Sequence, residues 1–218
     1  AGVIIGDGYL PDATKSKTDL SRDYRISIDI SDREFLKHLL KIIKTVITTK
    51  SKLGIPKQRG NRLPRLYLNI RNKDLFYFFH KNMQIPLGKK SSIVTVPTKI
   101  FESSKRIKKY FLAGYFDADG GFRGKTLGFT TASEHLCQGV SQILDEFKIG
   151  YSSELWINKK YNKKFYGIRL RENQLDKFLS TFPLQNIEKL MRIFDRFQCG
   201  GAGVVKRDGV CQGFLQTS

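Results

Sequence analysis

The chain repeats one order of motifs twice, and this duplication limits its possible folds more than any other feature. Residues of the stretch 68–79 recur 100 positions later, in 168–179, as Arg171, Leu175 and Phe178. The pair Ser31-Asp32 is matched 102 positions later, at 133–134, and segment 1–8 is matched 112 positions later, at 113–120. Three matches in the same order predict two similar halves that arose by internal duplication.

Hydrophobic periodicity predicts the same elements in each half. Apolar and polar residues alternate as in strands over 24–30, 65–71, 127–131, 151–159 and 165–171. Helical spacing is found over 31–47, with Ser31 as the expected N-cap, and over 74–81, 133–148, 173–182 and 186–197. We therefore expect an α+β fold of two pseudo-symmetric αββαββα halves. The first half with its linker covers 1–97, the second covers 98–197, and a Gly-rich tail covers 198–218.

The charge of the chain indicates a polyanionic partner. The 39 Lys and Arg residues against 20 Asp and Glu residues give a net charge of +19. Residues 1–110 hold 24 basic and 9 acidic groups, whereas residues 111–218 hold 15 and 11. Nucleic acid is the favoured partner, because neutralising phosphates releases condensed counterions. General solubility and an anionic membrane surface are the alternatives.

Composition also excludes several classes of protein. No apolar run is long enough to cross a membrane, and no signal peptide opens the chain. Three cysteines are too few for a disulfide scaffold, although Cys199 and Cys211 leave a pairing across the tail open. His38, His80 and His135 lie at no metal-binding spacing and are expected at the surface or in packing. The sequence thus predicts an intracellular globular protein.

The predicted strands carry a polar, basic face. Helices would cover the aliphatic face of each antiparallel sheet and leave the polar face free to contact a groove of DNA. An ordinary solvated face is the alternative, and Trp156 could equally serve in packing. The expected DNA-binding residues of both halves are Arg25, Ser27, Lys57, Arg59, Arg62, Arg65, Tyr67, Asn69, Arg71, Arg123, Lys125, Thr130, Trp156, Asn158, Lys159, Lys160, Lys163, Arg169 and Arg171.

Two Asp-Gly motifs follow stretches of small residues. Close packing of the two helices would bring Asp7 and Asp119 together at helix ends where the macrodipole is already negative. Two like charges there are unfavourable without a cation, and hard oxygen ligands suit Mg²⁺. The alternative is that each Asp-Gly pair merely ends its helix in a turn.

The run LAGYFDADG, residues 112–120, resembles the signature of the LAGLIDADG homing endonucleases at seven of nine positions. The segment AGVIIGDG, residues 1–8, resembles a second copy that has Ile5 in place of the first acid. The resemblance covers about residues 1–197 and is of the single-chain, double-motif type, intron-encoded and archaeal or organellar. It implies two antiparallel sheets that form a saddle over DNA, with the motif helices packed at the centre.

The resemblance also implies a chemistry. It points to a site-specific, metal-dependent double-strand DNA endonuclease, with Asp7 and Asp119 as catalytic metal ligands and the carbonyls of Gly6 and Ala118 as further ligands. Asp117 would be mostly structural. Lys90, with Lys89 as the alternative, would polarise the attacking water or offset charge on the phosphate, unless it only contacts the DNA backbone. Gln185 and Lys189 are the poorly matching counterparts in the second half.

The implied cofactor is Mg²⁺ or Mn²⁺, with Ca²⁺ as an ion that occupies the sites without supporting cleavage. The implied partner is double-stranded DNA bound by a monomer, with intron RNA as a further option and no membrane. The compartment would be the cytoplasm of an archaeon, or a mitochondrion or chloroplast. An intron RNA maturase or a non-cutting DNA-binding protein on the same fold is the alternative, and a ribosomal or chromatin protein is a weaker one.

Overall fold

The computed structural model describes residues 1–12, 24–47, 50–54, 66–160 and 162–199. The first half runs through α1 (Gly2–Gly6), β1 (Gly8–Tyr9), β2 (Arg25–Ile30), α2 (Arg33–Val46), β3 (Lys50–Gly54), β4 (Leu66–Arg71), α3 (Lys73–Tyr77) and η3 (Phe78–Asn82). The second half runs through α4 (Thr98–Phe101), α5 (Lys105–Asp119), β5 (Gly121–Arg123), β6 (Thr126–Thr131), α6 (Glu134–Glu146), β7 (Tyr151–Asn158), β8 (Lys163–Leu170), η4 (Glu172–Gln174), α7 (Leu175–Thr181) and α8 (Ile187–Cys199).

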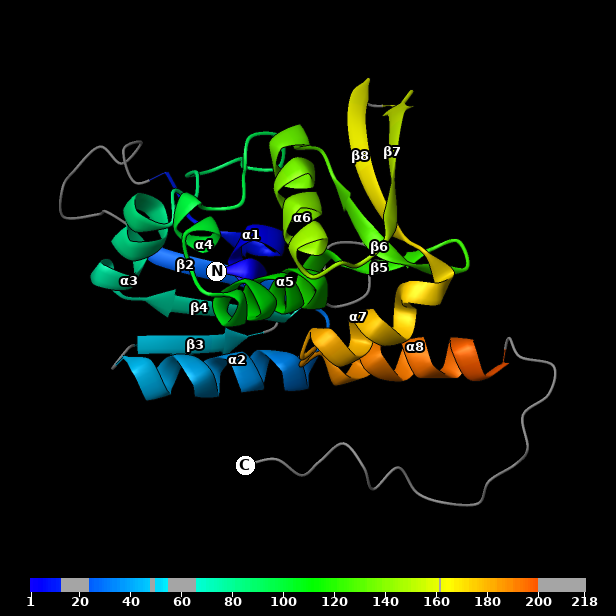
Figure 1. Cartoon of the computed structure of the whole chain (residues 1–218). Coiled ribbons are helices and arrows are strands. Elements are labelled where there is room, and N and C mark those ends of the chain that lie inside the picture. The colour runs from blue at the N-terminus through cyan, green and yellow to red at the C-terminus, as the bar shows by residue number, and fades with distance from the viewer. Residues whose placement is uncertain (13–23, 48–49, 55–65, 161, 200–218) are drawn as a thin grey trace, which may run out of the picture.

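Each half contains one four-stranded antiparallel sheet. The strand orders are β1-β2-β4-β3 and β5-β6-β8-β7, so the two sheets have the same topology. The predicted αββαββα order is confirmed in both halves, and α8 follows the second repeat. Figure 1 shows α1 and α5 close together between the two halves, with α2 and α8 end to end along one side of the molecule.

The alternation of the strands decides which sheet face is buried. Ile26 and Ile28 on β2, and Leu68 and Ile70 on β4, are almost fully buried, while their polar neighbours retain solvent contact. The second sheet buries Leu127 and Phe129 of β6 and Ile168 and Leu170 of β8 in the same way.

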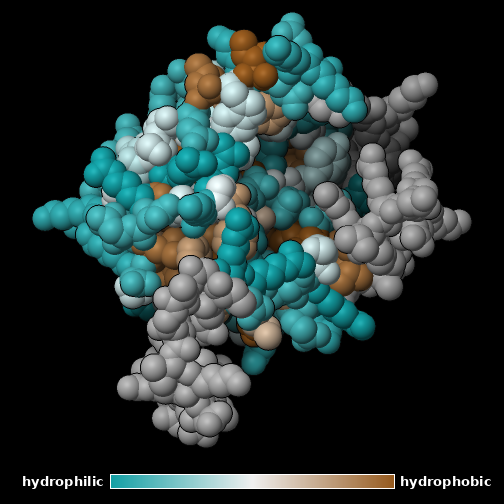
Figure 2. All heavy atoms as spheres, turned by 90° about the vertical axis from the view of Figure 1, so that its right-hand side faces the viewer, coloured by the Kyte–Doolittle hydropathy of each residue, from teal (hydrophilic) through white to brown (hydrophobic). Residues whose placement is uncertain are grey.

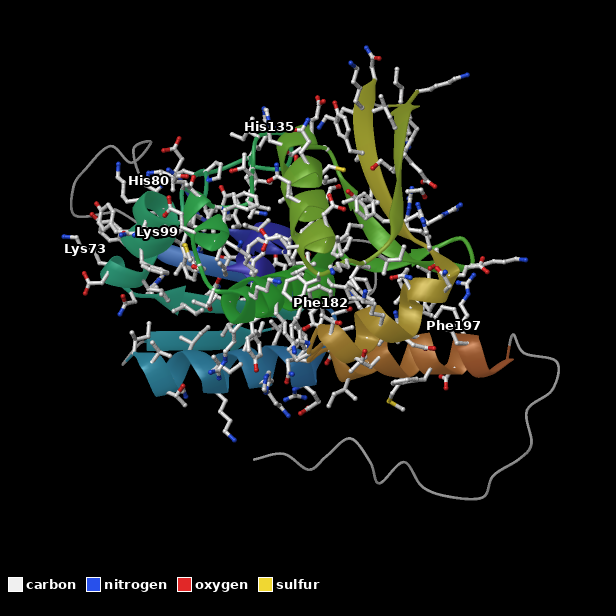
Figure 3. All side chains as sticks on the ribbon, viewed as in Figure 1. Lys73, His80, Lys99, His135, Phe182 and Phe197 are labelled. Atoms are coloured by element: carbon white, nitrogen blue, oxygen red, sulfur yellow. The ribbon has the colours of Figure 1, made fainter. Side chains whose placement is uncertain are left out.

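Aromatic rings fill the space between α5, β6 and α7. The ring of Phe116 lies 5.1 Å from that of Phe178, and Phe178 lies 4.8 Å from Phe182. Phe182 lies toward the middle of the molecule, whereas Phe197 lies near the far end of α8 (Figure 3). This cluster anchors the motif helix α5 firmly, since aromatic side chains bury the largest apolar areas.

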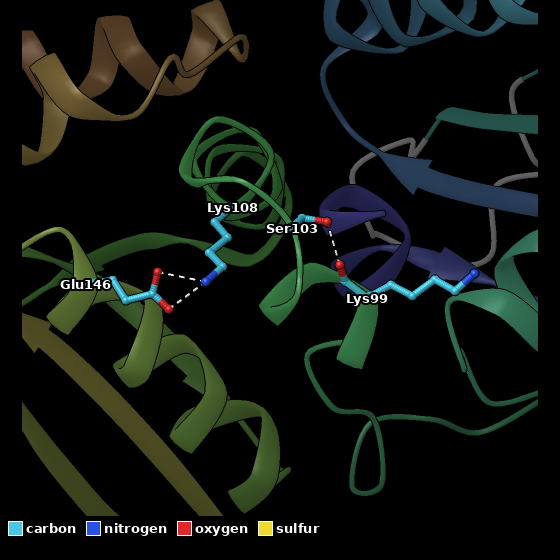
Figure 4. Close-up of polar contacts among 4 residues, drawn as sticks. All are labelled: Lys99, Ser103, Lys108 and Glu146. Carbon is cyan, nitrogen blue, oxygen red and sulfur yellow. Dashed lines mark hydrogen bonds and ion pairs between the residues drawn. The ribbon is translucent and has the colours of Figure 1, made fainter.

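A half-buried ion pair ties α5 to α6. The Lys108 Nζ atom lies 2.8 Å from both carboxylate oxygens of Glu146, as Figure 4 shows. Nearby, the Ser103 hydroxyl donates a hydrogen bond of 2.5 Å to the Lys99 carbonyl at the end of α4. Both contacts fix the start of α5. They therefore help to set the orientation of this helix relative to the first half.

Two local predictions were wrong in detail. Asp32, not Ser31, is the N-cap of α2, and its carboxylate accepts a hydrogen bond of 3.0 Å from the Phe35 amide. The aliphatic residues Leu155 and Ile157 of β7 are 62 % and 56 % exposed, not buried. In Figure 1 the β7–β8 hairpin extends beyond the end of α6.

The side of the molecule that carries this hairpin is mostly hydrophilic, with separate hydrophobic patches (Figure 2). Within the described part of the chain, none of the helices is both long enough and apolar enough to cross a lipid bilayer.

Candidate active site and nucleic-acid interface

Small residues allow α1 and α5 to pack with their backbones nearly in contact. A methyl group added to Gly2 would lie 2.1 Å from the Phe111 carbonyl oxygen and 2.6 Å from the Tyr115 amide nitrogen. A methyl group at Gly6 would lie 2.6 Å from the Ala118 Cβ atom. The motif helices therefore approach each other closely, as predicted. A larger side chain at either glycine would separate them.

This packing brings the ends of the two helices together. Asp7 caps the C-terminus of α1, and Asp119 is the last residue of α5. The Asp119 carboxylate lies beside Gly6, 3.3 Å from the position that a Gly6 Cβ atom would take. Burial raises the pKa of Asp119, and the positive charges of Lys90 and Lys189 oppose that shift. One acid from each half thus lies at the shared helix end.

Lys90 reaches the end of α1 from the linker between the halves. Its Nζ atom donates hydrogen bonds of 2.6 Å to the Ile5 carbonyl and 2.8 Å to the Gly6 carbonyl. Burial lowers the pKa of Lys90, whereas Asp119 and Asp7 oppose the shift. Lys90 therefore satisfies carbonyls at the negative end of the helix dipole and lies in the field of both acids.

Lys189 of α8 is the counterpart of Lys90, and the sequence did not establish this role. Its Nζ atom shares its three N–H groups among four carbonyl oxygens at the end of α5, at 2.8, 2.8, 3.1 and 2.7 Å from Phe116, Asp117, Ala118 and Gly120. Burial lowers the pKa of Lys189, and Asp117, Asp7 and Asp119 oppose that shift. The only available signal was its place after the second repeat, since its partners lie about 70 positions away.

Asp117 holds the start of α8 and does not point to the shared helix end. Its carboxylate oxygens accept hydrogen bonds from the Gln185 amide at 2.9 Å and the Asn186 amide at 3.1 Å. The Asn186 side chain returns a bond of 3.2 Å to the Asp117 carbonyl. Burial raises the pKa of Asp117 to about 6. These contacts position α8, and with it Lys189.

A cavity of about 230 Å³ lies beside the Asp7 carboxylate. Its lining combines the end of β2, including Asp29, with Ala118 of α5 and Glu188, Lys189 and Arg192 of α8. The amide of Asp29 donates a hydrogen bond of 3.3 Å to the Asp7 carbonyl. Asp29 is thus an acid beside the centre to which the sequence pattern assigns no role.

The donor set at the helix ends fits a hard divalent cation. It comprises the carboxylates of Asp7 and Asp119 and the carbonyls of Gly6 and Ala118, all oxygen donors. Lys90 and Lys189 already donate to these two carbonyls, but a carbonyl oxygen retains a second lone pair. No group of three or more His, Cys, Asp or Glu side chains that could hold a metal occurs among the described residues. His80 on η3 and His135 on α6 lie on separate elements (Figure 3).

The uncovered face of the first sheet carries the predicted polar residues. In the strand register Arg25 pairs with Arg71, Ser27 with Asn69 and Asp29 with Tyr67, which puts all six on one face. The Ser27 hydroxyl donates a hydrogen bond of 2.7 Å to the Asn69 side chain. Four predicted residues of this half, Lys57, Arg59, Arg62 and Arg65, lie outside the described residues, as does Cys211 of the possible disulfide.

The second sheet carries its predicted residues on the corresponding face. The register aligns Thr130 with Gly167, Trp156 with Phe165 and Asn158 with Lys163, and Arg169 follows on the same face. Arg171 directly follows β8 and is exposed. Lys125, Lys159 and Lys160 lie in the hairpin turns and are exposed or nearly so. The Trp156 ring stacks on Phe165 at 5.9 Å, and the Arg123 guanidinium lies over it at 4.6 Å.

Comparison with known proteins identifies this arrangement. Residues 106–183 match the family model of the LAGLIDADG-like domain. A solved structure of the homing endonuclease I-DmoI in complex with DNA and Mn superposes with a TM-score of 0.59 at 21 % identity, over 83 % of this chain and 92 % of that one. The chain has the LAGLIDADG fold.

The LAGLIDADG fold also occurs in a solved protein that is not named as an endonuclease. The N-terminal LAGLIDADG domain of DUF199/WhiA superposes with a TM-score of 0.52 at 14 % identity, over 88 % of this chain and 83 % of that one. Likeness at this level of identity concerns the fold alone.

Curated relatives by sequence come from the archaeon Methanocaldococcus jannaschii. The replication factor C small subunit is 28 % identical over 196 residues, which is 89 % of this chain and 10 % of that protein. The probable translation initiation factor IF-2 is 32 % identical over 91 residues, 39 % of this chain and 8 % of that protein. The chain thus spans about a tenth of the length of the curated relatives it matches.

Proposed function

We propose that the chain is a site-specific endonuclease that cuts both strands of a DNA target. The observation that carries this proposal is the meeting of Asp7 and Asp119, one from each pseudo-symmetric half, at the ends of two close-packed helices. A binding protein needs no pair of acids next to a polyanion, because acids there repel phosphate. A nuclease that uses a divalent cation needs them.

The sheets supply the binding surface in this proposal. Their uncovered faces present the arginines, asparagines and threonines described above to a DNA duplex. The protein acts as a monomer, because both halves of the centre are in one chain. Support comes from the fold, which it shares with I-DmoI in complex with DNA and with I-WcaI bound to its DNA recognition sequence.

Asp7 and Asp119, with the carbonyls of Gly6 and Ala118, would hold Mg²⁺ or Mn²⁺. When bound, the metal supplies Lewis-acid polarisation of the scissile phosphate and lowers the pKa of the attacking water. I-DmoI has been solved with DNA and Mn and with DNA and Ca, which supports divalent ions at such a centre. Hydrolysis forms one bond from a water oxygen to phosphorus and breaks one phosphorus–oxygen ester bond.

The two lysines complete the mechanism. Lys90 and Lys189 hold the helix-end carbonyls in place and put two positive charges in the field of both acids. Positive charge fixed where the phosphate gains charge in the transition state lowers the barrier. Burial lowers the pKa of both lysines, which makes each a better proton donor to a leaving oxygen than an exposed lysine.

The test is cleavage of a DNA library with Mg²⁺, followed by a cleavage and binding assay on the selected target. Asp7→Asn and Asp119→Asn should each reduce double-strand cutting by about 100-fold or more, since each removes a metal ligand. Both variants should keep target binding. Glu102→Gln removes an exposed acid at the end of α4 and is the matched control, with cutting unchanged. Cutting at the wild-type rate by both variants would overturn the mechanism.

A DNA-binding protein without nuclease activity is the second candidate, favoured by the likeness to the WhiA domain. It predicts sequence-selective binding with no cleavage under any divalent ion. The same assay separates the two functions.

A further inference from the structure

On the uncovered face of the second sheet, one carboxylate lies between two arginines. Glu154 of β7 contacts the Arg123 Nη2 atom at 2.5 Å through Oε2 and the Arg169 Nε atom at 3.3 Å through Oε1. The side chains of Arg123, Glu154 and Arg169 are 23 %, 31 % and 44 % exposed. Arg123 is therefore the inner member of the cluster, and Arg169 is the member that reaches furthest into solvent.

Glycines form the floor of this cluster. A methyl group at Gly167 would lie 2.9 Å from both the Arg123 Nη2 atom and the Trp156 ring. A methyl group at Gly128 would lie 2.9 Å from the Arg123 Cγ atom, and one at Gly124 would lie 2.8 Å from the Arg169 Nη2 atom. The register places Gly167 directly opposite Glu154 and Gly128 directly opposite Arg169. The absence of side chains at these positions lets both guanidinium groups lie low over the strands.

The cluster is poorly suited to simple phosphate binding. Glu154 cancels positive charge at the point where a polyanion would approach, and a carboxylate near phosphates weakens non-specific attraction. What the carboxylate does supply is orientation. The Arg169 guanidinium forms its ion pair with Glu154 through Nε. Its two terminal Nη groups therefore form the edge that lies further from Glu154. A guanidinium held in one orientation can donate two parallel hydrogen bonds to the O6 and N7 atoms of guanine.

We propose that Glu154 is a positioning residue for target specificity, which holds Arg169 as the reader of one guanine in the half-site under the second sheet. Arg123, stacked on Trp156, fixes Glu154 from the other side. The inference rests on the proposed function as a site-specific DNA-binding enzyme and adds to it a residue that sets which base pair is required.

The experiment measures binding, so it does not depend on cleavage. A target selected by the wild-type protein from a randomised library is varied one base pair at a time, and equilibrium binding is measured without divalent ions at one salt concentration. Glu154→Gln should reduce discrimination at one guanine position by about tenfold, because a good bidentate contact discriminates by about that factor. Its affinity for non-specific DNA should rise, since a negative charge is lost. Arg169→Lys, which keeps the charge but lacks the fork, should lose discrimination at the same position.

Glu102→Gln is the control, because it removes one negative charge outside the cluster. It should leave the discrimination profile unchanged. The inference is overturned if Glu154→Gln keeps the wild-type profile, or if it loses discrimination equally at all positions. If Glu154→Gln does not fold, Arg169→Lys alone decides, and a wild-type profile from it overturns the inference. A wild-type protein that selects no sequence from the library would instead overturn the proposed function itself.

Discussion

Two acids of one motif, Asp117 and Asp119, are two positions apart and serve different parts of the molecule. Asp117 accepts hydrogen bonds from the start of α8, and Asp119 lies against Gly6 of α1. Successive helical residues point in directions about 100° apart, so two positions separate the side chains widely. This separation explains why Ile5 can replace the first acid in the other motif copy without removing an acid from the shared helix end.

The raised pKa of Asp117 predicts a pH-dependent stability. Its folded-state pKa of about 6 lies above the ordinary 3.8, so its contribution is greatest at low pH and is lost as the pH rises through 6. Asp117→Asn cannot ionise. Between about pH 4 and pH 7, the free energy of unfolding of the variant should therefore improve relative to the wild type by about 2 kcal/mol. Urea unfolding at a series of pH values measures this, and a difference that stays constant with pH would contradict it.

Lys189 predicts a stability effect that its position on a helix surface would not suggest. Lys189→Met removes the ammonium group from the end of α5. The Phe116 and Asp117 carbonyls keep the Gly120 amide and the Asn186 side chain as donors, but those of Ala118 and Gly120 lose Lys189. The free energy of unfolding should therefore fall by about 2 kcal/mol. Lys177→Met is the matched control, because exposed Lys177 donates only one bond, of 2.7 Å, to the Lys148 carbonyl. Its effect should stay below about 1 kcal/mol. Equal losses in thermal or urea unfolding would show that the helix-end carbonyls do not need Lys189.

The sequence predicted the acids better than the lysine. Asp7 and Asp119 belong to a local motif, and their environment follows from the small residues beside them in the chain. Lys90 was reached through a family resemblance, and the same resemblance offered Lys189 only beside Gln185, as one of two poorly matching counterparts. Its contacts join α8 to α5 across the length of the second half, and helical periodicity carries no information on such pairings.

At the scale of elements, alternation and helical spacing predicted the longer strands and most helices, but β1, β3, β5 and α4 lie outside the predicted ranges. The local errors, in the N-cap of α2 and in the burial of β7, concern properties that depend on residues close in space and not only on the local sequence. Ser31 and Asp32 are both good N-caps, and only the actual end of β2 selects Asp32, which is then the equivalent of Ser133 in α6. Leu155 and Ile157 fit a buried face by pattern but are more than half exposed.

The contact of α1 with α5 gives a prediction at this scale. Gly6→Ala puts a methyl group 2.6 Å from the Ala118 Cβ atom, so the helices must move apart. Overpacking of this kind should cost about 2 kcal/mol of stability and should also slow cleavage, because the acids of the two halves separate. Gly121→Ala, whose added methyl meets no atom within 4 Å, is the control and should be nearly neutral. Unfolding and cleavage of both variants, measured together, decide whether the helix contact sets the geometry of the centre.

At the scale of the whole molecule, the net charge of +19 is divided unequally between two halves of the same topology. Part of the positive charge in the second half is neutralised internally, since Glu154 contacts two arginines and Glu146 contacts Lys108. The lysines Lys159, Lys160, Lys163 and Lys164 lie at the outer end of the β7–β8 hairpin, away from the central helices (Figure 1). The two halves should therefore hold DNA with unequal numbers of phosphate contacts.

This inequality can be measured as the salt dependence of binding. Replacing Lys57, Arg59, Arg62 and Arg65 by Gln removes four charges from the first half, and replacing Lys159, Lys160, Lys163 and Lys164 removes four from the second. Each lost phosphate contact lowers the slope of log affinity against log salt by about 0.9. We expect the first set to lower the slope by about 3 and the second by about half as much, in titrations on one target at several salt concentrations. Both sets change the net charge equally. Equal slopes would therefore mean that the total charge, and not its placement in the first half, determines the salt dependence of DNA binding.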